Sequence, residues 1–330
     1  MKIVFMGTPS YATAIFEKLL QNGFEVVALF TQPDKPVGRK QILTPPHIKQ
    51  FCIEKNIEVE IFQPQKLRET SNIEILQRLA PDLIVVAAYG QILPKEILKI
   101  APCVNLHASV LPAYRGASPI QESLLFMDKF TGVTAMMMDE GLDTGQILAI
   151  SYIKIDYKQK IGELYDVLSQ AAADLTVEII DRFPQLKGIA QNNSKSSSCK
   201  KIKKEDGLIE FCNANEIWSK FRAFCDWPGI FIENGLKLKE LDFCEGDSKN
   251  KNGILLQIKN RSVIIGCETG SIEIFTVAPP SKQQMNVVDY LRGKRLNVGD
   301  LLSWRMRVDS NLSHKFDLKR LIETIFGLYK

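Results

Sequence analysis

Four short apolar runs alternate with amphipathic segments in the first third of the chain, and this alternation limits the fold more than any other feature. The apolar runs are residues 2–6, 25–31, 82–88 and 103–107, and helical spacing appears in residues 12–22, 45–55 and 70–79. Strands that are buried on both faces read as continuous apolar runs and alternate with helices in parallel sheets. We therefore expect an α/β domain with a Rossmann-like, mostly parallel sheet.

Polar or turn-forming residues follow each of these runs. They are Gly7-Thr8-Pro9, Pro33-Asp34, Tyr89-Gly90 and His107-Ala108-Ser109. Ligands of open α/β sheets bind outside the carboxyl ends of the strands, so the expected site lies at this edge. Because no G-x-G-x-x-G follows the first run, the sequence disfavours a nicotinamide enzyme.

The pattern continues beyond residue 107 with further helices and strands. Ser118 is a capping residue before Pro119 at the first helical position, which predicts a helix to about residue 128. Strands are expected at residues 134–138 and 147–153, and the spacing over residues 162–182 predicts the helix that closes the domain.

A change of composition after residue 189 predicts a second domain. Residues 190–204 are rich in Asn, Ser and Lys and indicate a linker. A capping-box pattern at residues 213–216 predicts a short helix to residue 221. Strand candidates, separated by Gly and Asn, then indicate a small antiparallel barrel: residues 230–232, 236–241, 254–259, 261–267 and 271–277. We expect a catalytic domain at 1–189, the linker at 190–204, the barrel at 205–308 and a helical tail at 309–330.

Composition excludes several classes of protein. The seven cysteines are an odd number without a C-x-x-C pair, which fits neither a disulfide framework nor a zinc site. We expect a reducing cytoplasmic location, no metal and no membrane span, and the amino terminus reads as a first buried strand rather than a signal peptide.

The net charge of +4 is divided unevenly along the chain. Residues 1–189 carry 19 Lys and Arg against 21 Asp and Glu, a balance of −2, while residues 190–330 carry 23 against 17, a balance of +6. A modest excess of basic residues ordinarily reflects solvated side chains on the surface. Its segregation into one half makes an anionic partner a second interpretation.

Asn105 and His107 stand out at the end of the fourth run. Residues i and i+2 of a strand face the same way, so the two side chains can meet one ligand atom. Taken singly, an Asn or a His at a strand end more often has a structural role than a catalytic one. Asp143, which precedes Thr144-Gly145, likewise suits an ordinary turn. The combination of Asn105 and His107 at the end of one strand favours a functional role for the pair. The other two histidines, His47 and His314, do not occupy comparable positions.

The segments that surround these residues resemble those of the folate-dependent formyltransferases. The resemblance is carried, in the order of that family, by residues 6–9, 31–39, 104–120 and 139–145, and it extends to about residue 307. It implies that the second domain is OB-like and that formyl passes from 10-formyltetrahydrofolate to the α-amino group of initiator methionyl-tRNA. Asn105 and His107 would then bind the developing oxyanion, while Asp143 sets the protonation of the histidine and relays the amine proton.

The resemblance also implies residues that bind the two substrates. Folate would contact Ser109, Val110, Leu111 and Pro112, opposite Tyr89, Gly90 and Ile92. The tRNA would contact Arg39 as the principal residue, with weaker contributions from Lys35 and Lys40. A basic run at Lys201, Lys203 and Lys204 extends this expected tRNA surface, although surface lysines are solvated by default. For Arg115, a carboxylate partner and a substrate contact both remain open.

Two other functions fit the same residues less well. A related folate enzyme would formylate an amino sugar nucleotide or hydrolyse the formyl-folate, but the basic loop and linker favour tRNA. A non-catalytic tRNA-binding module would not need the Asn, His and Asp set, which is complete here. We expect a monomer.

Overall fold

The computed structural model describes residues 1–302 apart from Arg39, Glu245 and Asp247. The chain divides into two compact units, residues 1–209 with 215–231, and residues 210–214 with the described residues from 232 onward. The expected tail at 309–330 lies outside the described residues.

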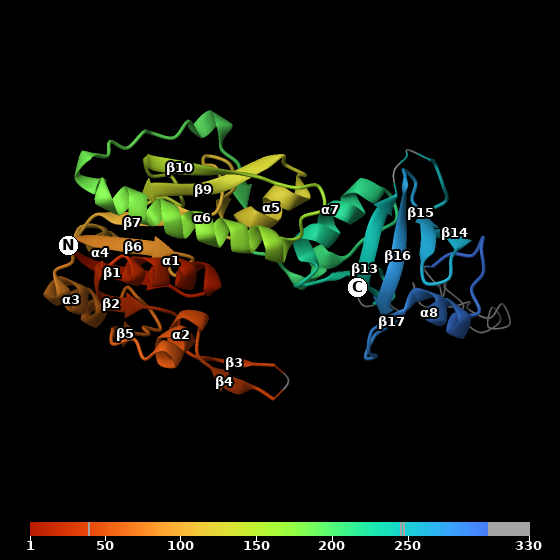
Figure 1. Ribbon diagram of the computed structural model, residues 1–330, viewed down its shortest axis with the longest axis horizontal. Coiled ribbons are helices and arrows are strands. Elements are labelled where there is room, and N and C mark those ends of the chain that lie inside the picture. Colours follow the sequence, from red (N-terminus) through yellow and green to blue (C-terminus); the bar gives the residue numbers. More distant parts are fainter. Residues whose placement is uncertain (39, 245, 247, 303–330) are drawn as a thin grey trace, which may run out of the picture. The chain divides into compact units, whose positions relative to one another are not determined.

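A mostly parallel sheet of seven strands forms the first unit, with the order β10-β9-β7-β6-β1-β2-β5 (Figure 1). Only the β7–β9 and β9–β10 pairs of this sheet are antiparallel. The strand order changes direction between β1 and β6, which is the switch point where ligands bind in open sheets. The Rossmann-like prediction is confirmed by these strands: β1 (Lys2–Gly7), β2 (Glu25–Phe30), β5 (Glu60–Phe62), β6 (Leu83–Ala87), β7 (Cys103–His107), β9 (Phe130–Met137) and β10 (Ile147–Lys154).

Helices cover both faces of this sheet because alternate strand residues point to opposite sides. On one face, Phe5 packs on Phe16 of α1, and α1 packs on α6, which lies along the sheet in Figure 1. On the other face, Val4 and Met6 join the core with residues of α3 and α4. The helices are α1 (Ser10–Gln21), α2 (His47–Lys55), α3 (Thr70–Leu79), α4 (Lys95–Leu98), α5 (Pro119–Leu125), α6 (Ile161–Asp181) and α7 (Ala214–Phe224).

Short elements connect this framework. The loop after β2 forms a hairpin that the sequence did not predict, with β3 (Lys35–Val37) paired antiparallel to β4 (Ile42–Thr44). A second unpredicted pair joins distant segments, β8 (Arg115–Gly116) and β11 (Ser198–Cys199). Single turns of 3-10 helix occur at Phe183–Gln185, Asn193–Lys195 and Lys204–Gly207.

Helix α7 belongs with the first unit, although it follows the boundary predicted at residue 205. Its Trp218 Nε1 donates to the carbonyl of Tyr157 at 3.3 Å. The buried Arg222 donates to the carbonyls of Gln159 and Asp156 at 2.8 and 3.0 Å. These bonds fix the helix on the loop before α6. The domain limits themselves stay a prediction.

The second unit is built on an antiparallel sheet, as the sequence predicted. Its path is β13-β16-β15-β14, and β17 pairs with β16. The elements are β13 (Lys237–Cys244), β14 (Ile254–Ile258), β15 (Val263–Gly266), β16 (Ser271–Ala278), β17 (Met285–Asn286) and α8 (Val287–Lys294), with β12 (Ile230–Phe231) at the boundary. Alternating residues such as Ile272 and Ile274 are fully buried and form its core.

One local prediction is wrong. The helix α5 begins at Pro119 as expected, but the Ser118 side chain does not cap it. Instead, the Ser118 hydroxyl donates to the carbonyl of Lys200 at 2.8 Å, because β11 runs directly beside it. A long-range partner has replaced the local one.

All seven cysteines are free thiols. Among the described residues, no helix combines the length and the apolar character that crossing a bilayer requires.

Candidate functional site

Asn105 and His107 lie at the carboxyl end of β7, on one face of the strand. Both side chains are nearly buried, with exposed fractions of 9% and 6%. The sequence predicted that their spacing would direct them to one point. The structure shows that point to be the carboxylate of Asp143, to which both turn.

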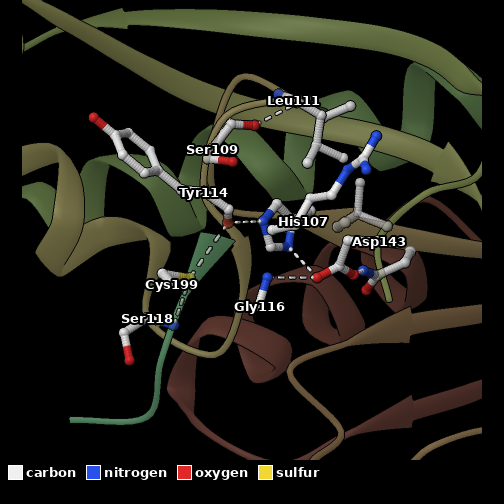
Figure 2. A network of polar contacts seen from close by, with 12 residues as sticks. His107, Ser109, Leu111, Tyr114, Gly116, Ser118, Asp143 and Cys199 are labelled. Carbon is white, nitrogen blue, oxygen red and sulfur yellow. Dashed lines mark hydrogen bonds and ion pairs between the residues drawn. The ribbon is translucent and has the colours of Figure 1, made fainter. Parts of the chain in front are cut away.

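Asp143 reaches the pair from the loop between β9 and β10. Its Oδ1 accepts from Asn105 Nδ2 at 3.4 Å. Its Oδ2 accepts from the backbone N–H of Gly116 at 2.9 Å, as Figure 2 shows. His107 Nδ1 lies 3.7 Å from the same Oδ2. Asp143 has a φ of 53°, a left-handed conformation that is uncommon for a residue with a side chain. The loop is therefore held in a specific shape around the carboxylate.

The second ring nitrogen of His107 defines its tautomer. Nε2 lies 2.9 Å from the carbonyl oxygen of Tyr114 (Figure 2). A carbonyl only accepts, so Nε2 carries a proton and donates it. In the neutral ring, the lone pair is consequently on Nδ1, the atom that faces Asp143.

Residues 109–113 form a closed turn above β7. The Ser109 hydroxyl donates to the carbonyl of Ala113 at 2.6 Å. The fully buried Thr134 hydroxyl donates to the carbonyl of Ser109 at 2.6 Å and accepts from the N–H of Leu111 at 3.0 Å. Leu111 precedes Pro112 in a cis peptide bond, and both Ser109 and Leu111 are buried. Val110 and Pro112 are partly exposed, so they and the backbone are what this turn offers to a ligand.

The β8–β11 pair supports the residues that contact His107 and Asp143. Gly116 has a φ of 125°, and a Cβ atom there would lie 2.2 Å from the carbonyl oxygen of Cys199. Only glycine therefore fits this approach. The Cys199 thiol donates to the carbonyl of Tyr114 and accepts from the N–H of Ser118, at 3.4 and 3.2 Å. Burial raises the pKa of this thiol, which keeps its proton on sulfur.

Arg115 binds two amide side chains instead of the carboxylate that the sequence left open. Its guanidinium donates to the side-chain oxygen of Gln191 at 3.0 and 2.7 Å and to that of Asn193 at 2.9 Å. The amide nitrogen of Gln191 then donates to the backbone carbonyls of Asp143 and Gly145. Two side-chain amides thus bind this cation, and a contact of Arg115 with substrate stays a prediction.

The predicted folate residues after β6 differ in what they expose. The Tyr89 ring is 2% exposed and packs in the sheet core, so it does not line an open pocket. Its carbonyl accepts from Thr8 Oγ1 and Gln32 Nε2, at 3.0 and 3.1 Å, at the switch point. Gly90 has a φ of 84°, and Ile92 is 85% exposed. Backbone groups and Ile92 are therefore what this loop presents.

The predicted tRNA residues lie on exposed segments, where they are described. Lys35 and Lys40 are exposed on and beside the β3–β4 hairpin, while Arg39 lies outside the described residues. Asp34, at the base of the hairpin, binds Lys49 Nζ at 2.9 Å and Gln63 Nε2 at 2.7 Å, which lowers the pKa of its carboxyl. Exposed side chains also occur along the basic run, at Lys201, Lys203 and Lys204.

Sequence patterns missed Tyr114, Gly116 and Gln191 as parts of this site. Tyr114 and Gly116 contribute only backbone atoms, which no side-chain pattern predicts, although a glycine beside a basic residue in a turn was a usable signal. Gln191 lies 48 residues from Asp143 in sequence. Within the described ranges, no group of three or more His, Cys, Asp or Glu residues is placed to hold a metal ion.

Two family models match the chain and together span most of it. The formyl transferase model matches residues 1–180, and the formyl transferase C-terminal domain model matches residues 201–295. The first match ends within α6, and the second begins at the basic run.

Relatives of known name agree with these matches. A methionyl-tRNA formyltransferase of a Nitratiruptor species is 59% identical over 300 residues, which cover 91% of this chain and 99% of that protein. The solved sugar 3N-formyl transferase WlaRD is 21% identical, with a TM-score of 0.64 over 87% of this chain and 98% of that one. HypX from Aquifex aeolicus in complex with tetrahydrofolic acid is 16% identical, with a TM-score of 0.61 over 92% of this chain and 50% of that one. The chain belongs to the formyltransferase family.

Proposed function

We propose that this protein transfers the formyl group of 10-formyltetrahydrofolate to the α-amino group of initiator methionyl-tRNA, giving N-formylmethionyl-tRNA for translation initiation. The observation that carries the proposal is the convergence of Asn105 and His107 on the Asp143 carboxylate. It occurs in a chain that is 59% identical to a protein named methionyl-tRNA formyltransferase, over 99% of that protein.

The reaction needs hydrogen-bond donors and a proton acceptor. The α-amino nitrogen bonds to the formyl carbon while negative charge gathers on the formyl oxygen. The carbon–nitrogen bond to the folate then breaks, the amine loses a proton and the folate nitrogen gains one. Donors placed at the oxygen and a base near the amine lower this barrier.

Asn105 is the donor for the formyl oxygen in this proposal. Its amide nitrogen carries two hydrogens, and one is directed at Asp143. Among the contacts of the described residues, no partner takes the other hydrogen. The side chain is held by a strand and a carboxylate, so it is oriented before the substrate arrives.

His107 and Asp143 act as the proton-accepting pair. Because Nε2–H is committed to the Tyr114 carbonyl, Nδ1 is the ring atom that can receive the amine proton. The imidazolium so formed faces a carboxylate 3.7 Å away, which stabilises its charge. Protonated Nδ1 is then also a donor for the formyl oxygen or for the leaving folate nitrogen.

The folate fits the edge between β6 and β7. These strands are neighbours, so the loop from Tyr89 to Ile92 and the turn from Ser109 to Pro112 begin at adjacent carboxyl ends. Backbone groups in such loops can bind the polar edge of a flat heterocycle, and Ile92, Val110 and Pro112 supply apolar contact.

The tRNA contacts in this proposal are Arg39, Lys35 and Lys40, together with Lys201, Lys203 and Lys204. The lysines are exposed and are free to meet phosphates. Phosphate contacts give affinity without base recognition, and they weaken as salt rises. We assign the reaction to the cytoplasm, where translation begins, and to a monomer.

The test is a transfer assay with labelled 10-formyltetrahydrofolate and purified wild-type protein. Charged initiator tRNA, a nucleotide-linked amino sugar and buffer alone are offered as acceptors in parallel. We expect label on methionyl-tRNA and neither sugar formylation nor formate release at a comparable rate. Label on the sugar, or formate released without an acceptor, would move the enzyme to the corresponding related activity, and tRNA binding without transfer would make it a binding module.

A further inference from the structure

Gln191 lies in the segment that composition marks as a linker, yet it joins two loops of the candidate site. Its amide nitrogen donates to the carbonyls of Asp143 and Gly145, at 2.9 and 2.8 Å. Its amide oxygen accepts two bonds from Arg115, at 3.0 and 2.7 Å. A solvated linker residue would make no such set of contacts.

The chemistry of these partners fixes the orientation of the amide. A guanidinium only donates and a carbonyl only accepts, so the oxygen must face Arg115 and the nitrogen must face the Asp143 loop. The flipped amide would oppose like groups on both sides. Glutamine is the side chain of this length that meets both demands, because glutamate lacks the donors and lysine lacks the acceptor.

Each partner of Gln191 is anchored to the site by other contacts. Arg115 is fixed by the Asn193 side chain and by its own N–H, which donates to the carbonyl of Ser197 at 2.9 Å. Its neighbour Gly116 donates to the Asp143 carboxylate. Gln191 therefore completes a ring of contacts in which the backbone and the side chain of Asp143 are both tied to residues 115–116.

The conformation of the Asp143 loop requires stabilising contacts of this kind. Asp143 adopts a left-handed conformation, which costs free energy unless its surroundings enforce it. Its Oδ2 lies 3.7 Å from His107 Nδ1, beyond direct hydrogen-bond reach, so a small shift of the loop decides whether the two groups meet. The two hydrogen bonds from Gln191 hold the backbone carbonyls of Asp143 and Gly145. Because these groups are part of the same loop as the Asp143 side chain, they limit how far its carboxylate can move relative to His107.

We propose that Gln191 is a positioning residue for formyl transfer, which fixes the Asp143 loop on the Arg115 segment and so sets how Asp143 meets His107. The inference rests on the proposed function, because Gln191 acts only through Asp143. It gives the segment before the second unit a part in the chemistry, distinct from any contact with tRNA.

Two substitutions separate the two halves of the Gln191 contact. Gln191→Glu keeps the acceptor for Arg115 but places a carboxylate against two carbonyls, whereas Gln191→Ala removes both halves. We expect both variants to lose about 10- to 100-fold in kcat, since small misplacements of reacting groups have effects of this size. KM for methionyl-tRNA and for the folate should stay within about threefold of wild type. Gln77→Glu on the exposed side of α3 is the matched control and should be unchanged.

If Gln191 merely tethered Arg115, Gln191→Glu would keep that tether and transfer at the wild-type rate, which would overturn the proposal. Melting temperatures of both variants show whether they fold. The second measurement is a double-mutant cycle with Asp143→Asn. We expect Gln191→Ala to slow the wild type but not the Asp143→Asn enzyme, whereas equal slowing in both backgrounds would show that Gln191 does not act through Asp143.

Failure of the proposed function has a separate signature. A wild type that does not formylate methionyl-tRNA refutes the substrate, and the same cycle is then run with the acceptor that it does use, or with formate release. An Asp143→Asn enzyme at the wild-type rate refutes the role of Asp143. A slow Asp143→Asn enzyme beside unimpaired Gln191 variants refutes the positioning role alone.

Discussion

The carboxyl end of β7 and the β3–β4 hairpin follow strands of the same sheet, but they are built in opposite ways. At β7, Asn105 and His107 are nearly buried and the Asp143 side chain is 13% exposed. Backbone groups of Tyr114 and Gly116 bind His107 and Asp143, and the Asp143 carboxylate binds Asn105. In the hairpin, all residues of both strands are exposed, including the apolar Ile42 and Leu43 at 61% and 66%. The first region is held in one arrangement by its own fold, and the second presents its side chains outward.

This difference matches the two tasks in the proposed reaction. Stabilising a developing charge requires groups that are already oriented, because reorganising them would cost free energy during the reaction. Binding a large polyanion requires accessible cations and apolar groups. We therefore expect substitutions at β7 to change kcat and substitutions in the hairpin to change KM for tRNA.

The largest effect is expected for Asp143→Asn. The substitution keeps the size of the side chain but removes the negative charge that faces His107. Loss of one electrostatic group at a transition state commonly costs about 10²–10³ in turnover, or roughly 3–4 kcal/mol. Initial rates at saturating methionyl-tRNA measure it, and Asp166→Asn on the exposed face of α6 is the control. Turnover within a factor of two of wild type would remove Asp143 from the mechanism.

Gly116→Ala should damage both stability and activity. The new Cβ would lie 2.2 Å from the Cys199 carbonyl at a φ of 125°, so β8 and β11 must separate. We expect a loss of about 3 kcal/mol or more in the free energy of unfolding, measured by urea denaturation, together with a fall in kcat. Gly23→Ala measures the cost of a positive φ alone. Gly23 also has a positive φ, but no atom lies within 4 Å of the added Cβ. An equal loss in both variants would show that the close approach is unimportant.

A smaller effect is expected for Thr134→Val, which preserves shape but removes a buried hydroxyl. The Ser109 carbonyl would lose its donor and the Leu111 N–H its acceptor. Buried groups left without partners cost about 1–3 kcal/mol, so the urea midpoint should fall. Thr44→Val in the exposed hairpin is the control. An unchanged midpoint for Thr134→Val would mean that the turn finds other partners.

The smallest effect is expected for substitutions in and beside the β3–β4 hairpin. Lys35→Ala combined with Lys40→Ala should raise KM for methionyl-tRNA by roughly two- to fivefold, because exposed charge contacts contribute about 1 kcal/mol or less. The slope of log KM against log salt should also become shallower, as fewer phosphates are neutralised. Lys55→Ala, at the exposed end of α2, serves as the control. A fall in kcat with unchanged KM would contradict the division between the two regions.

Sequence predicted the framework of the site because its signals are local. The apolar runs predicted β1, β2, β6 and β7, and the two-residue spacing of Asn105 and His107 predicted that they share a face. The parallel pattern also predicted the edge of the sheet at which they lie. Family resemblance added Asp143, whose own surroundings read as an ordinary turn.

The remaining features depend on contacts between distant segments, which no local pattern encodes. Asn, Ser and Lys around Gln191 indicated a linker because they cannot form a core, but polar residues can be fixed equally well by hydrogen bonds. Ser118 read as a cap until β11 supplied the Lys200 carbonyl as its partner. Tyr89 was expected to contact folate, and its ring lies in the core, because a strand end predicts where a residue lies better than which way its side chain turns. A contact through its backbone stays a prediction.

The most direct test of the account is single-turnover formyl transfer with the protein in excess over labelled methionyl-tRNA and with saturating 10-formyltetrahydrofolate. Three proteins are compared: the wild type, His107→Ala and the Lys35→Ala, Lys40→Ala double variant. We predict that His107→Ala is slower by about 10²–10³-fold while the double variant matches the wild type once its tRNA is bound. Rapid transfer by His107→Ala, or a slow step in the saturated double variant, would contradict the assignment of the chemistry to β7 and of recognition to the hairpin.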